Sequence, residues 1–259
     1  MASTKFNKEI TIEETRDMLI KLKTPAMAGS FLKLATDPSC QNLTFVEAVY
    51  AMAAQELESR SEKRQERYLQ RSGLREISVW NQVDIDKTIY TVERNLKERD
   101  LRRLLSCDWI YDANNVLISG ATGTGKSWLL ALLGKQACLS GYRTLYRGYR
   151  QLAELLSDAR EHRETAQLRK QLNSYKLLII DDFGGLNISD DLAADLLTVL
   201  EEREGTSSVA IASQDPFEAW HERLGSGKNA DAIMDRLVNR SYRFMLGGTS
   251  LRERNKVEL

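Results

Sequence analysis

The feature that most constrains this chain is a glycine-rich stretch near its middle. The stretch runs from Gly120 to Ser127 as GATGTGKS and fits the pattern G-x-x-x-x-G-K-[ST]. Residues 115–119 before it, with an apolar centre at 116–118, predict a buried strand, and residues 128–139 after it have the pattern of a helix. Glycines let successive N–H groups converge on one point, and a helix N-terminus adds its positive dipole end. The stretch therefore predicts a polyphosphate-binding loop.

Each part of this loop has an expected contact with a nucleotide. The backbone cradles the phosphates, Lys126 reaches the β- and γ-phosphates, and the Ser127 hydroxyl binds Mg²⁺, so we expect ATP and Mg²⁺ as ligands. The expected nucleotide-binding residues are Gly120, Ala121, Thr122, Gly123, Thr124, Gly125, Lys126 and Ser127. A glycine-rich turn that matches by chance is the alternative, and the flanking strand and helix patterns count against it.

Strand and helix patterns alternate after the loop. With residues 115–119, the expected strands are 143–147, 176–182, 208–213 and 241–246. Such alternation is typical of a parallel sheet covered by helices on both faces. The predicted fold is therefore α/β, a P-loop nucleotide-binding domain with a five-stranded parallel sheet.

Two carboxylates close the third expected strand. Asp181 lies 55 residues after Lys126, and because ligands bind at the carboxyl ends of parallel strands, we expect it to hold Mg²⁺. Asp182 takes the place of the glutamate that orients the attacking water in many ATPases, and its shorter side chain predicts slow hydrolysis. A buried doublet without a catalytic role is the alternative, although uncompensated buried carboxylates are costly. Ser213 and Gln214 end the fourth strand, where either could touch the γ-phosphate or the water.

Two arginines follow toward the C-terminus. Arg236 lies on a helix that leads into the last strand, from which it could act in trans as an arginine finger on a neighbour's nucleotide. A surface ion pair with Asp231 or Asp235 is the alternative. Only thirteen residues follow Leu246, too few for a helical lid. We therefore expect a neighbouring subunit to cover the nucleotide, and Arg252 could place a second charge on the γ-phosphate.

The N-terminal part predicts helices throughout. Capping boxes begin at Thr11 and Thr44, and Pro25 opens a helix between them. A polar amphipathic helix is expected near residues 87–105, and residues 108–110 are expected to pack onto the nucleotide domain. The predicted domains are a small all-helical domain at 1–73, a connector at 74–110 and an ATPase domain at 111–259.

Arginines recur along the helix that begins at Thr44. Arg60, Arg64, Arg67 and Arg71 follow one another at i, i+4, i+7 and i+11, which places them on one helix face. A solvated face with a few ion pairs is one interpretation, and contact with DNA phosphates that reads no bases is the other. The expected DNA-binding residues are Arg60, Arg64, Arg67, Arg71, Arg147 and Arg150.

Composition adds limits rather than a function. Lys+Arg and Asp+Glu are both 37, so the net charge does not indicate a partner. The three cysteines form no C-x-x-C pair, which argues for a reducing compartment and against a zinc module. The sequence has no apolar run of membrane-spanning length and no leader at Met1. We expect a soluble cytoplasmic protein.

Several strings of the chain resemble a known family. They are LKTPAMA at 22–28, LIIDDFG at 178–184, ASQDP at 212–216, WHE at 220–222, ADAI at 230–233, DRLV at 235–238 and GTSLR at 248–252. In these residues, over nearly the whole chain, the sequence resembles the AAA+ ATPases of the helicase-loader branch, and within it the IstB-type helper ATPases of transposition. Residues 72–100 show no such match.

The resemblance carries specific expectations. It implies a lid-less AAA+ module in which Arg236 is the arginine finger, Arg252 the sensor-2 arginine, and Ser213 or Gln214 sensor 1. It also implies an ATP-dependent homo-oligomer on double-stranded DNA that delivers this DNA to a partner transposase. A replicative helicase loader of the DnaC/DnaI type, which prefers single strands, is one alternative. A small-molecule kinase is another, but it would need a lid and an acceptor site.

Overall fold

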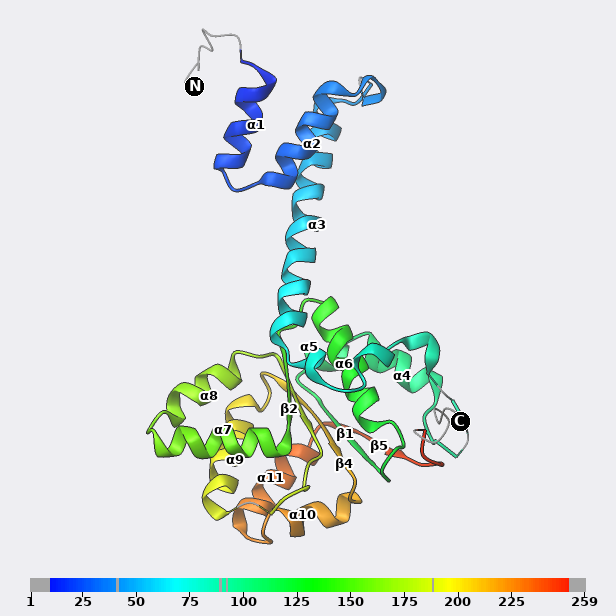
Figure 1. The fold of residues 1–259 in the computed structure, drawn as a ribbon, viewed down its shortest axis with the longest axis vertical. Coiled ribbons are helices and arrows are strands. Elements are labelled where there is room, and N and C mark those ends of the chain that lie inside the picture. The colour runs from blue at the N-terminus through cyan, green and yellow to red at the C-terminus, as the bar shows by residue number, and fades with distance from the viewer. Residues whose placement is uncertain (1–9, 41, 89, 92, 188, 252–259) are drawn as a thin grey trace, which may run out of the picture. The chain divides into compact units, whose positions relative to one another are not determined.

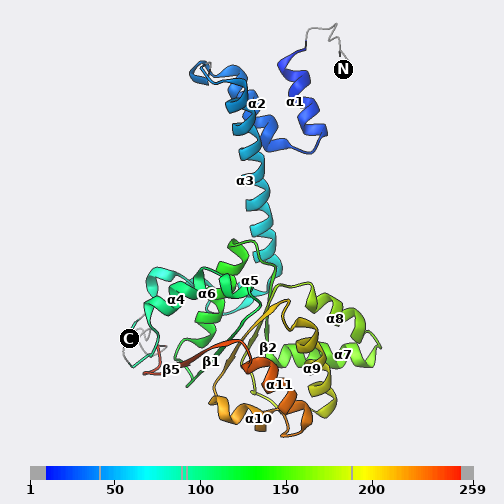
Figure 2. The ribbon, with the colours of Figure 1, turned by 180° about the vertical axis from the view of Figure 1, so that it is seen from behind.

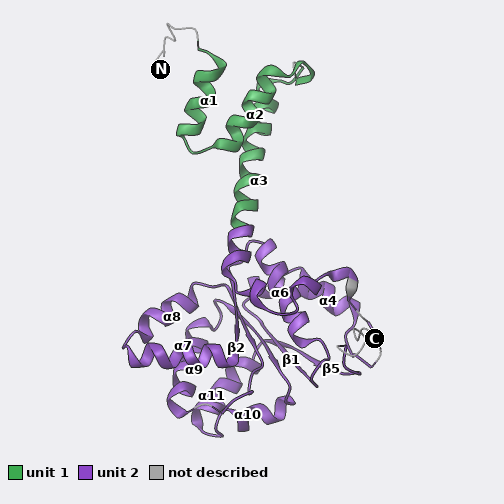
Figure 3. Ribbon diagram, viewed as in Figure 1, with its two compact units in different colours: residues 1–64 green, residues 65–259 purple. Residues whose placement is uncertain are grey.

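The computed structural model of the protein describes residues 10–251 except 41, 89, 92 and 188. It divides into two compact units, residues 1–64 and 65–259 (Figure 3). The division falls inside one long helix, α3 (Phe45–Arg71). The sequence predicted a boundary after residue 73 and a separate connector, whereas residues 74–110 lie in the second unit.

The first unit is helical, as predicted. It contains α1 (Ile12–Lys21), α2 (Pro25–Thr36), the short 3-10 helix η1 (Pro38–Cys40) and most of α3 (Figure 1). Thr11 Oγ1 accepts a hydrogen bond from the Glu14 N–H at 3.1 Å, so the predicted capping box is present. Among the described residues of this unit only Ala28 and Glu56 are buried. The described part of the first unit is a set of helices with almost no apolar core.

The second unit is built on a five-stranded parallel sheet, as predicted, in the order β2-β3-β4-β1-β5. The strands are β1 (Asn115–Gly120), β2 (Thr144–Gly148), β3 (Leu177–Asp181), β4 (Ser208–Ser213) and β5 (Ser241–Leu246). Every residue of β3 and β4 is buried, which explains their continuous apolar patterns because both faces of such strands are covered.

Helices cover both faces of this sheet (Figures 1 and 2). One face packs Val116, Ile118 and Ile179 against α4 (Glu98–Leu105), α5 (Asp108–Tyr111) and α6 (Lys126–Leu139). The alternate strand residues pack on the other face against the remaining long helices. Those helices are α7 (Tyr149–Glu161), α8 (Thr165–Asn173), α9 (Asp190–Arg203) and α11 (Lys228–Val238).

The segment before the phosphate loop is mostly irregular. The helix predicted near residues 87–105 is wrong in extent, because among the described residues of that range α4 is the only α-helix. Asn95 has a left-handed φ of 55°, a conformation that ends a right-handed helix. Trp109 and Ile110 are buried as expected. The short elements of this unit are η2 (Leu74–Glu76), η3 (Trp80–Gln82), η4 (Ile85–Lys87), η5 (Phe217–Ala219) and α10 (Trp220–Arg223).

No helix within the described residues is both long and apolar enough to cross a membrane.

Candidate functional site

The predicted phosphate loop connects β1 to α6. Gly125, the residue before α6, has a φ of 91°, a conformation that residues other than glycine rarely adopt. A Cβ at Gly120 would lie 2.3 Å from the Leu246 carbonyl oxygen, so this glycine is needed for the close approach of β5. The strand, turn and helix required by the motif are therefore all present.

Lys126 lies at the centre of the loop. Its side chain is buried, and its Nζ donates hydrogen bonds to the carbonyl oxygens of Gly120 at 2.7 Å and Ala121 at 3.0 Å. These contacts keep an ammonium group against the loop backbone, and phosphate oxygens can replace the carbonyl acceptors. The geometry suits a lysine that binds the outer phosphates of a nucleotide.

Asp181 lies at the carboxyl end of β3 and is buried. It accepts hydrogen bonds from Tyr146 Oη at 2.5 Å and from the Asp182 N–H at 2.9 Å, and it also interacts with the Ser127 hydroxyl. Burial raises the pKa of the Asp181 carboxyl, since it outweighs the hydrogen bonds from Ser127 and Tyr146, which lower this pKa.

The two predicted metal ligands are thus in contact with each other. A hydroxyl and a carboxylate are oxygen donors of the kind that Mg²⁺ takes when it also binds substrate phosphates. A divalent cation would also favour the ionised form of Asp181, which burial disfavours. Ser127 and Asp181 therefore fit the cation that a phosphate loop normally uses.

Asp182 differs from its neighbour in exposure. Its side chain is exposed, and its backbone has a left-handed φ of 54°, an unfavourable conformation for a residue other than glycine that often occurs at functional sites. Asp181 and Asp182 therefore do not form a buried pair. The Asp182 carboxylate is accessible to solvent beside the candidate metal site.

Ser213 and Gln214 have different surroundings. The buried Ser213 Oγ donates to the Phe183 carbonyl at 2.6 Å and accepts from the Asp215 N–H at 3.1 Å. Gln214 is exposed, and its Oε1 accepts a hydrogen bond from Thr122 Oγ1 of the phosphate loop at 2.7 Å. Of the two predicted sensor residues, Gln214 makes a side-chain hydrogen bond with the loop, and Ser213 bonds the backbone of Phe183 and Asp215.

Arg236 lies near the amino end of β1, whereas the phosphate loop follows the carboxyl end of this strand. Its backbone carbonyl accepts from the side chain of Asn115, the first residue of β1, at 3.1 Å. Its Nη2 lies 2.7 Å from Glu201 of α9, and its Nε lies 3.9 Å from Glu204. The expected ion-pair partners were Asp231 and Asp235, but Asp231 lies 2.8 Å from His221. Arg252, the other predicted arginine, lies outside the described residues.

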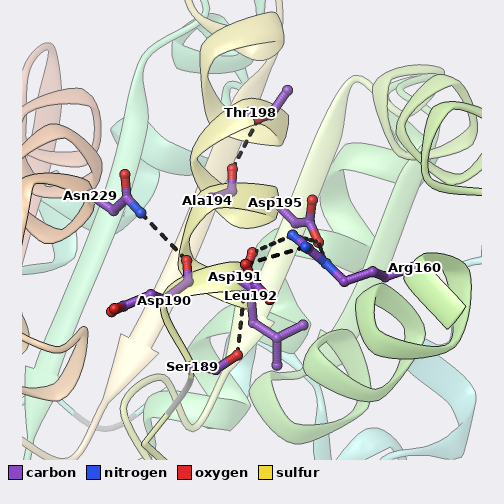
Figure 4. Close-up of polar contacts among 9 residues, drawn as sticks. All are labelled: Arg160, Ser189, Asp190, Asp191, Leu192, Ala194, Asp195, Thr198 and Asn229. Atoms are coloured by element: carbon purple, nitrogen blue, oxygen red, sulfur yellow. Dashed lines mark hydrogen bonds and ion pairs between the residues drawn. The ribbon is translucent and has the colours of Figure 1, made fainter.

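Helix α9, which carries Glu201 and is followed directly by Glu204, is anchored at its other end (Figure 4). Ser189 caps the helix by accepting a hydrogen bond from the Leu192 N–H at 3.3 Å. Arg160 of α7 lies 3.3 Å from Asp191 and 2.8 Å from Asp195, so it links the two helices. Glu201, the nearer acidic partner of Arg236, is therefore on a helix that is linked to its neighbour by ion pairs.

The predicted DNA-binding arginines have unequal surroundings. Arg60 donates to Glu56 at 2.8 Å and to the Lys23 carbonyl at 2.9 Å, so it helps to hold the turn between α1 and α2. Arg147 is half-buried and donates to the Tyr146 carbonyl. The remaining predicted residues, Arg64, Arg67, Arg71 and Arg150, have exposed side chains.

A cavity of about 440 Å³ lies beside the phosphate loop, and the sequence did not predict it. Its lining residues are Thr91, Glu93, Arg94, Thr124, Gly247, Gly248, Thr249 and Leu251. The segment after β5 is held on the loop, because the Leu251 N–H donates to the Gly123 carbonyl at 2.9 Å. The cavity is in the size range of small-molecule sites, and its walls come from segments without hydrophobic periodicity.

Comparisons with known proteins agree with this geometry. A family model described as IstB-like ATP binding protein matches residues 17–259. The putative insertion sequence ATP-binding protein y4pL of Sinorhizobium fredii is 35% identical over 93% of this chain and 97% of its own length. The IS1162 putative ATP-binding protein of Pseudomonas fluorescens is 33% identical over 79% of this chain and 87% of its own length.

Solved structures support the fold alone. The DnaC helicase loader matches with a TM-score of 0.56 and 16% identity over 64% of this chain and 97% of that one. AMPPCP-bound DnaA from Aquifex aeolicus matches with a TM-score of 0.55 and 18% identity over 66% of this chain and about half of the DnaA chain, 52%. The fold is that of an AAA+ P-loop NTPase, and the chain belongs to the IstB-like ATP-binding protein family.

Proposed function

We propose that this protein is an ATP-hydrolysing helper of transposition that assembles on duplex DNA and delivers it to a partner transposase. The observation that carries the proposal is the loop between β1 and α6, in which Lys126 lies on the Gly120 and Ala121 carbonyls, together with the buried Asp181 at the carboxyl end of β3. The relatives are insertion sequence ATP-binding proteins, which indicates transposition as the process in which such a site would act.

The loop residues would divide the work of nucleotide binding. Lys126 exchanges its contacts with the Gly120 and Ala121 carbonyls for contacts with the β- and γ-phosphates. Ser127 and Asp181 would hold Mg²⁺, which would neutralise phosphate charge. These residues would hold the nucleotide so that its γ-phosphate lies near the carboxyl ends of the strands.

Two further residues would act at the γ-phosphate. The exposed Asp182 orients the attacking water, and Gln214, which contacts Thr122 of the loop, senses the γ-phosphate. The contacts of Ser213 with Phe183 and Asp215 favour Gln214 for this role. Because aspartate is one methylene shorter than glutamate, we expect slow turnover.

Arg236 would complete the site of a neighbouring subunit. It lies near the amino end of β1, at the opposite end of this strand from its own loop, and its side chain is one quarter exposed. On assembly the guanidinium would leave Glu201 and contact the neighbour's γ-phosphate, where a finger arginine stabilises the charge of the transition state. Assembly and hydrolysis would then depend on each other.

Contact with duplex DNA would come from exposed arginines. Arg64, Arg67, Arg71 and Arg150 offer charges that bind phosphates without reading bases. Arg60 would contribute less, because it already contacts Glu56 and the Lys23 carbonyl. Binding of this kind tolerates sequence variation and weakens as salt rises.

The deciding experiment measures assembly on DNA with ATP, with ADP and without nucleotide, by sedimentation and electron microscopy. We expect oligomers on duplex DNA with ATP, and no such assembly in Lys126→Ala. The same measurement with single-stranded DNA separates this proposal from a helicase loader. A protein that stays monomeric with ATP and duplex DNA would contradict the proposal.

A further inference from the structure

Arg94 is a buried arginine in the wall of the cavity beside the phosphate loop. It lies in the irregular segment before α4 and is 4% exposed. Its backbone is fixed on both sides, because its N–H donates to Thr91 Oγ1 at 3.2 Å and its carbonyl accepts from the Gly247 N–H at 3.2 Å. These hydrogen bonds hold the Arg94 backbone between residues 91–94 and 247–251, the two segments that line most of the cavity.

The guanidinium of Arg94 reaches the phosphate loop itself. Its Cζ lies 5.8 Å from the centroid of the Trp128 ring, in the first turn of α6. A Cβ on Gly125 would lie 2.8 Å from Arg94 Nη2. Glycine at position 125 thus serves both the left-handed turn of the loop and the close approach of this arginine.

The position of this charge indicates the kind of group it binds. Burial lowers the pKa of Arg94, but a guanidinium stays charged in proteins. Its planar donors match phosphate oxygens, and a charge-assisted contact of this kind is among the stronger hydrogen bonds. An arginine that lines a cavity and touches the loop is therefore suited to a phosphate that lies between them.

The phosphate in question follows from the order of groups in a nucleotide. Lys126 and Ser127 act on the β- and γ-phosphates and the cation. The cavity, at about 440 Å³, has room for a base and ribose. A nucleotide with its base there and its outer phosphates at Lys126 places the α-phosphate at the junction, where Arg94 lies.

We propose that Arg94 binds the α-phosphate of the nucleotide whose base and ribose occupy the cavity lined by Thr91, Glu93 and Gly247. The inference rests on the proposed function only in that ATP is the ligand. It adds a positively charged side chain that is not part of the loop motif and that comes from the segment before α4. Because ATP and ADP share the α-phosphate, Arg94 strengthens binding of both.

The test compares Arg94→Gln, Arg94→Lys and the control Arg99→Gln, whose arginine side chain is 86% exposed in the same part of the chain. Calorimetry gives the Kd for ATP and for ADP, and thermal melting without nucleotide reports folding. We expect Arg94→Gln to weaken both ligands by about 10- to 100-fold. Arg94→Lys should be intermediate, since it keeps the charge but loses the planar donors, and Arg99→Gln should match wild type.

Three results would overturn the inference. Unchanged affinity for both ligands in folded Arg94→Gln would leave Arg94 a structural residue. A loss for ATP with ADP unchanged would place Arg94 at the γ-phosphate. If Arg94→Gln does not fold, the two diastereomers of ATPαS are compared in wild type and Arg94→Lys instead. A contact with the α-phosphate predicts that Arg94→Lys alters the preference of wild type for one diastereomer. An unaltered preference would exclude this contact.

These outcomes are separate from a failure of the proposed function. Wild-type protein that binds neither ATP nor ADP would remove the nucleotide site as a whole. Binding that is lost in Lys126→Ala and retained in Arg94→Gln would remove only the role of Arg94.

Discussion

The two units of the chain differ in what happens to their apolar residues. In the second unit the sheet is packed on both faces, and residues such as Leu117 and Trp220 are fully buried. In the first unit Phe45, Tyr50 and Leu57 are 70% or more exposed although they lie on regular helices. Helical periodicity therefore predicted the helices of both units, but it does not say whether an apolar face is covered within the chain.

The largest expected effect tests whether the well-packed second unit contains a complete catalytic site. Arg236→Ala should bind ATP nearly normally and lose on the order of a thousand-fold in turnover, because its guanidinium would act on a neighbour's γ-phosphate. Steady-state ATPase assays with duplex DNA give the rate. Mixing Arg236→Ala with Lys126→Ala should restore part of the activity, since one mixed interface has both an intact loop and an intact arginine.

No recovery at any ratio, with both variants folded and able to associate, would count against action in trans. Arg236 would then be an arginine that links α11 to α9 through Glu201.

The next effect tests the difference in packing directly. Trp220 is fully buried, with ring centroids of Phe183 and Phe217 at 5.0 and 5.2 Å and its Nε1 donating to the Asp215 carbonyl at 3.0 Å. Trp220→Ala should lower the free energy of unfolding by about 3–5 kcal/mol, as large core truncations do. Phe45→Ala should change it by less than about 0.5 kcal/mol, because that side chain is 83% exposed.

Denaturant unfolding of the full chain, without DNA or nucleotide, measures both changes. A loss in Phe45→Ala as large as that in Trp220→Ala would mean that Phe45 is covered in solution, and the contrast between the units would not hold.

The same contrast explains how much of the molecule the sequence predicted. Residues 208–213 and 241–246 were predicted with their observed bounds. The first strand, β4, is buried throughout and has an apolar run between its terminal serines, whereas β5 is partly exposed and alternates polar with apolar residues. The loop at 120–127 and Asp181 lie at the carboxyl ends of β1 and β3, where chain-local patterns predicted them. Ser213 was harder to assign, because a polar residue at a strand end can bond either a ligand or its own backbone, and here it bonds the backbone of Phe183 and Asp215.

Two parts of the site could not be found in this way. Tyr146 lies on β2 and its partner Asp181 on β3, and only the pairing of the strands brings them together. Arg94 lies in a segment without periodicity, and its neighbours Gly125 and Gly247 are distant in sequence. Contacts between segments depend on the tertiary fold, which local patterns do not specify.

A smaller effect is expected at Tyr146, which the sequence did not single out. Tyr146→Phe removes the hydrogen bond to Asp181 and should weaken Mg²⁺-dependent ATP binding by about tenfold, the worth of one such bond. That bond lowers the pKa of Asp181, so its loss raises the pKa further. Protons then compete better for the carboxylate, and the defect should grow as pH falls.

Titration of Mg²⁺ at two pH values, with the melting temperature as a control for folding, measures this effect. Equal Mg²⁺ dependence in wild type and Tyr146→Phe would mean that Tyr146 only fills space in the core.

The smallest expected effect concerns exposed charge. Replacing Arg64 and Arg67 together by alanine should lower the slope of log affinity for duplex DNA against log salt by roughly two, or one for each phosphate contact. ATP binding should not change, since both side chains are exposed and neither residue belongs to the phosphate loop. Filter binding over a range of salt concentrations gives the slope.

Arg60 is the matched comparison, because the same helix carries it but its guanidinium contacts Glu56 and the Lys23 carbonyl. Arg60→Ala should change the salt slope less than either of the other arginines and should loosen the turn between α1 and α2, which hydrogen exchange of the amides near Lys23 would report. Arg60→Ala could instead lower the salt slope by half as much as the double variant, which is an equal effect for each arginine. The contacts of Arg60 would then not limit its access to DNA. If neither variant changed the slope, the arginines of α3 would be solvated charges, and the exposed Arg150 would be the next residue to test.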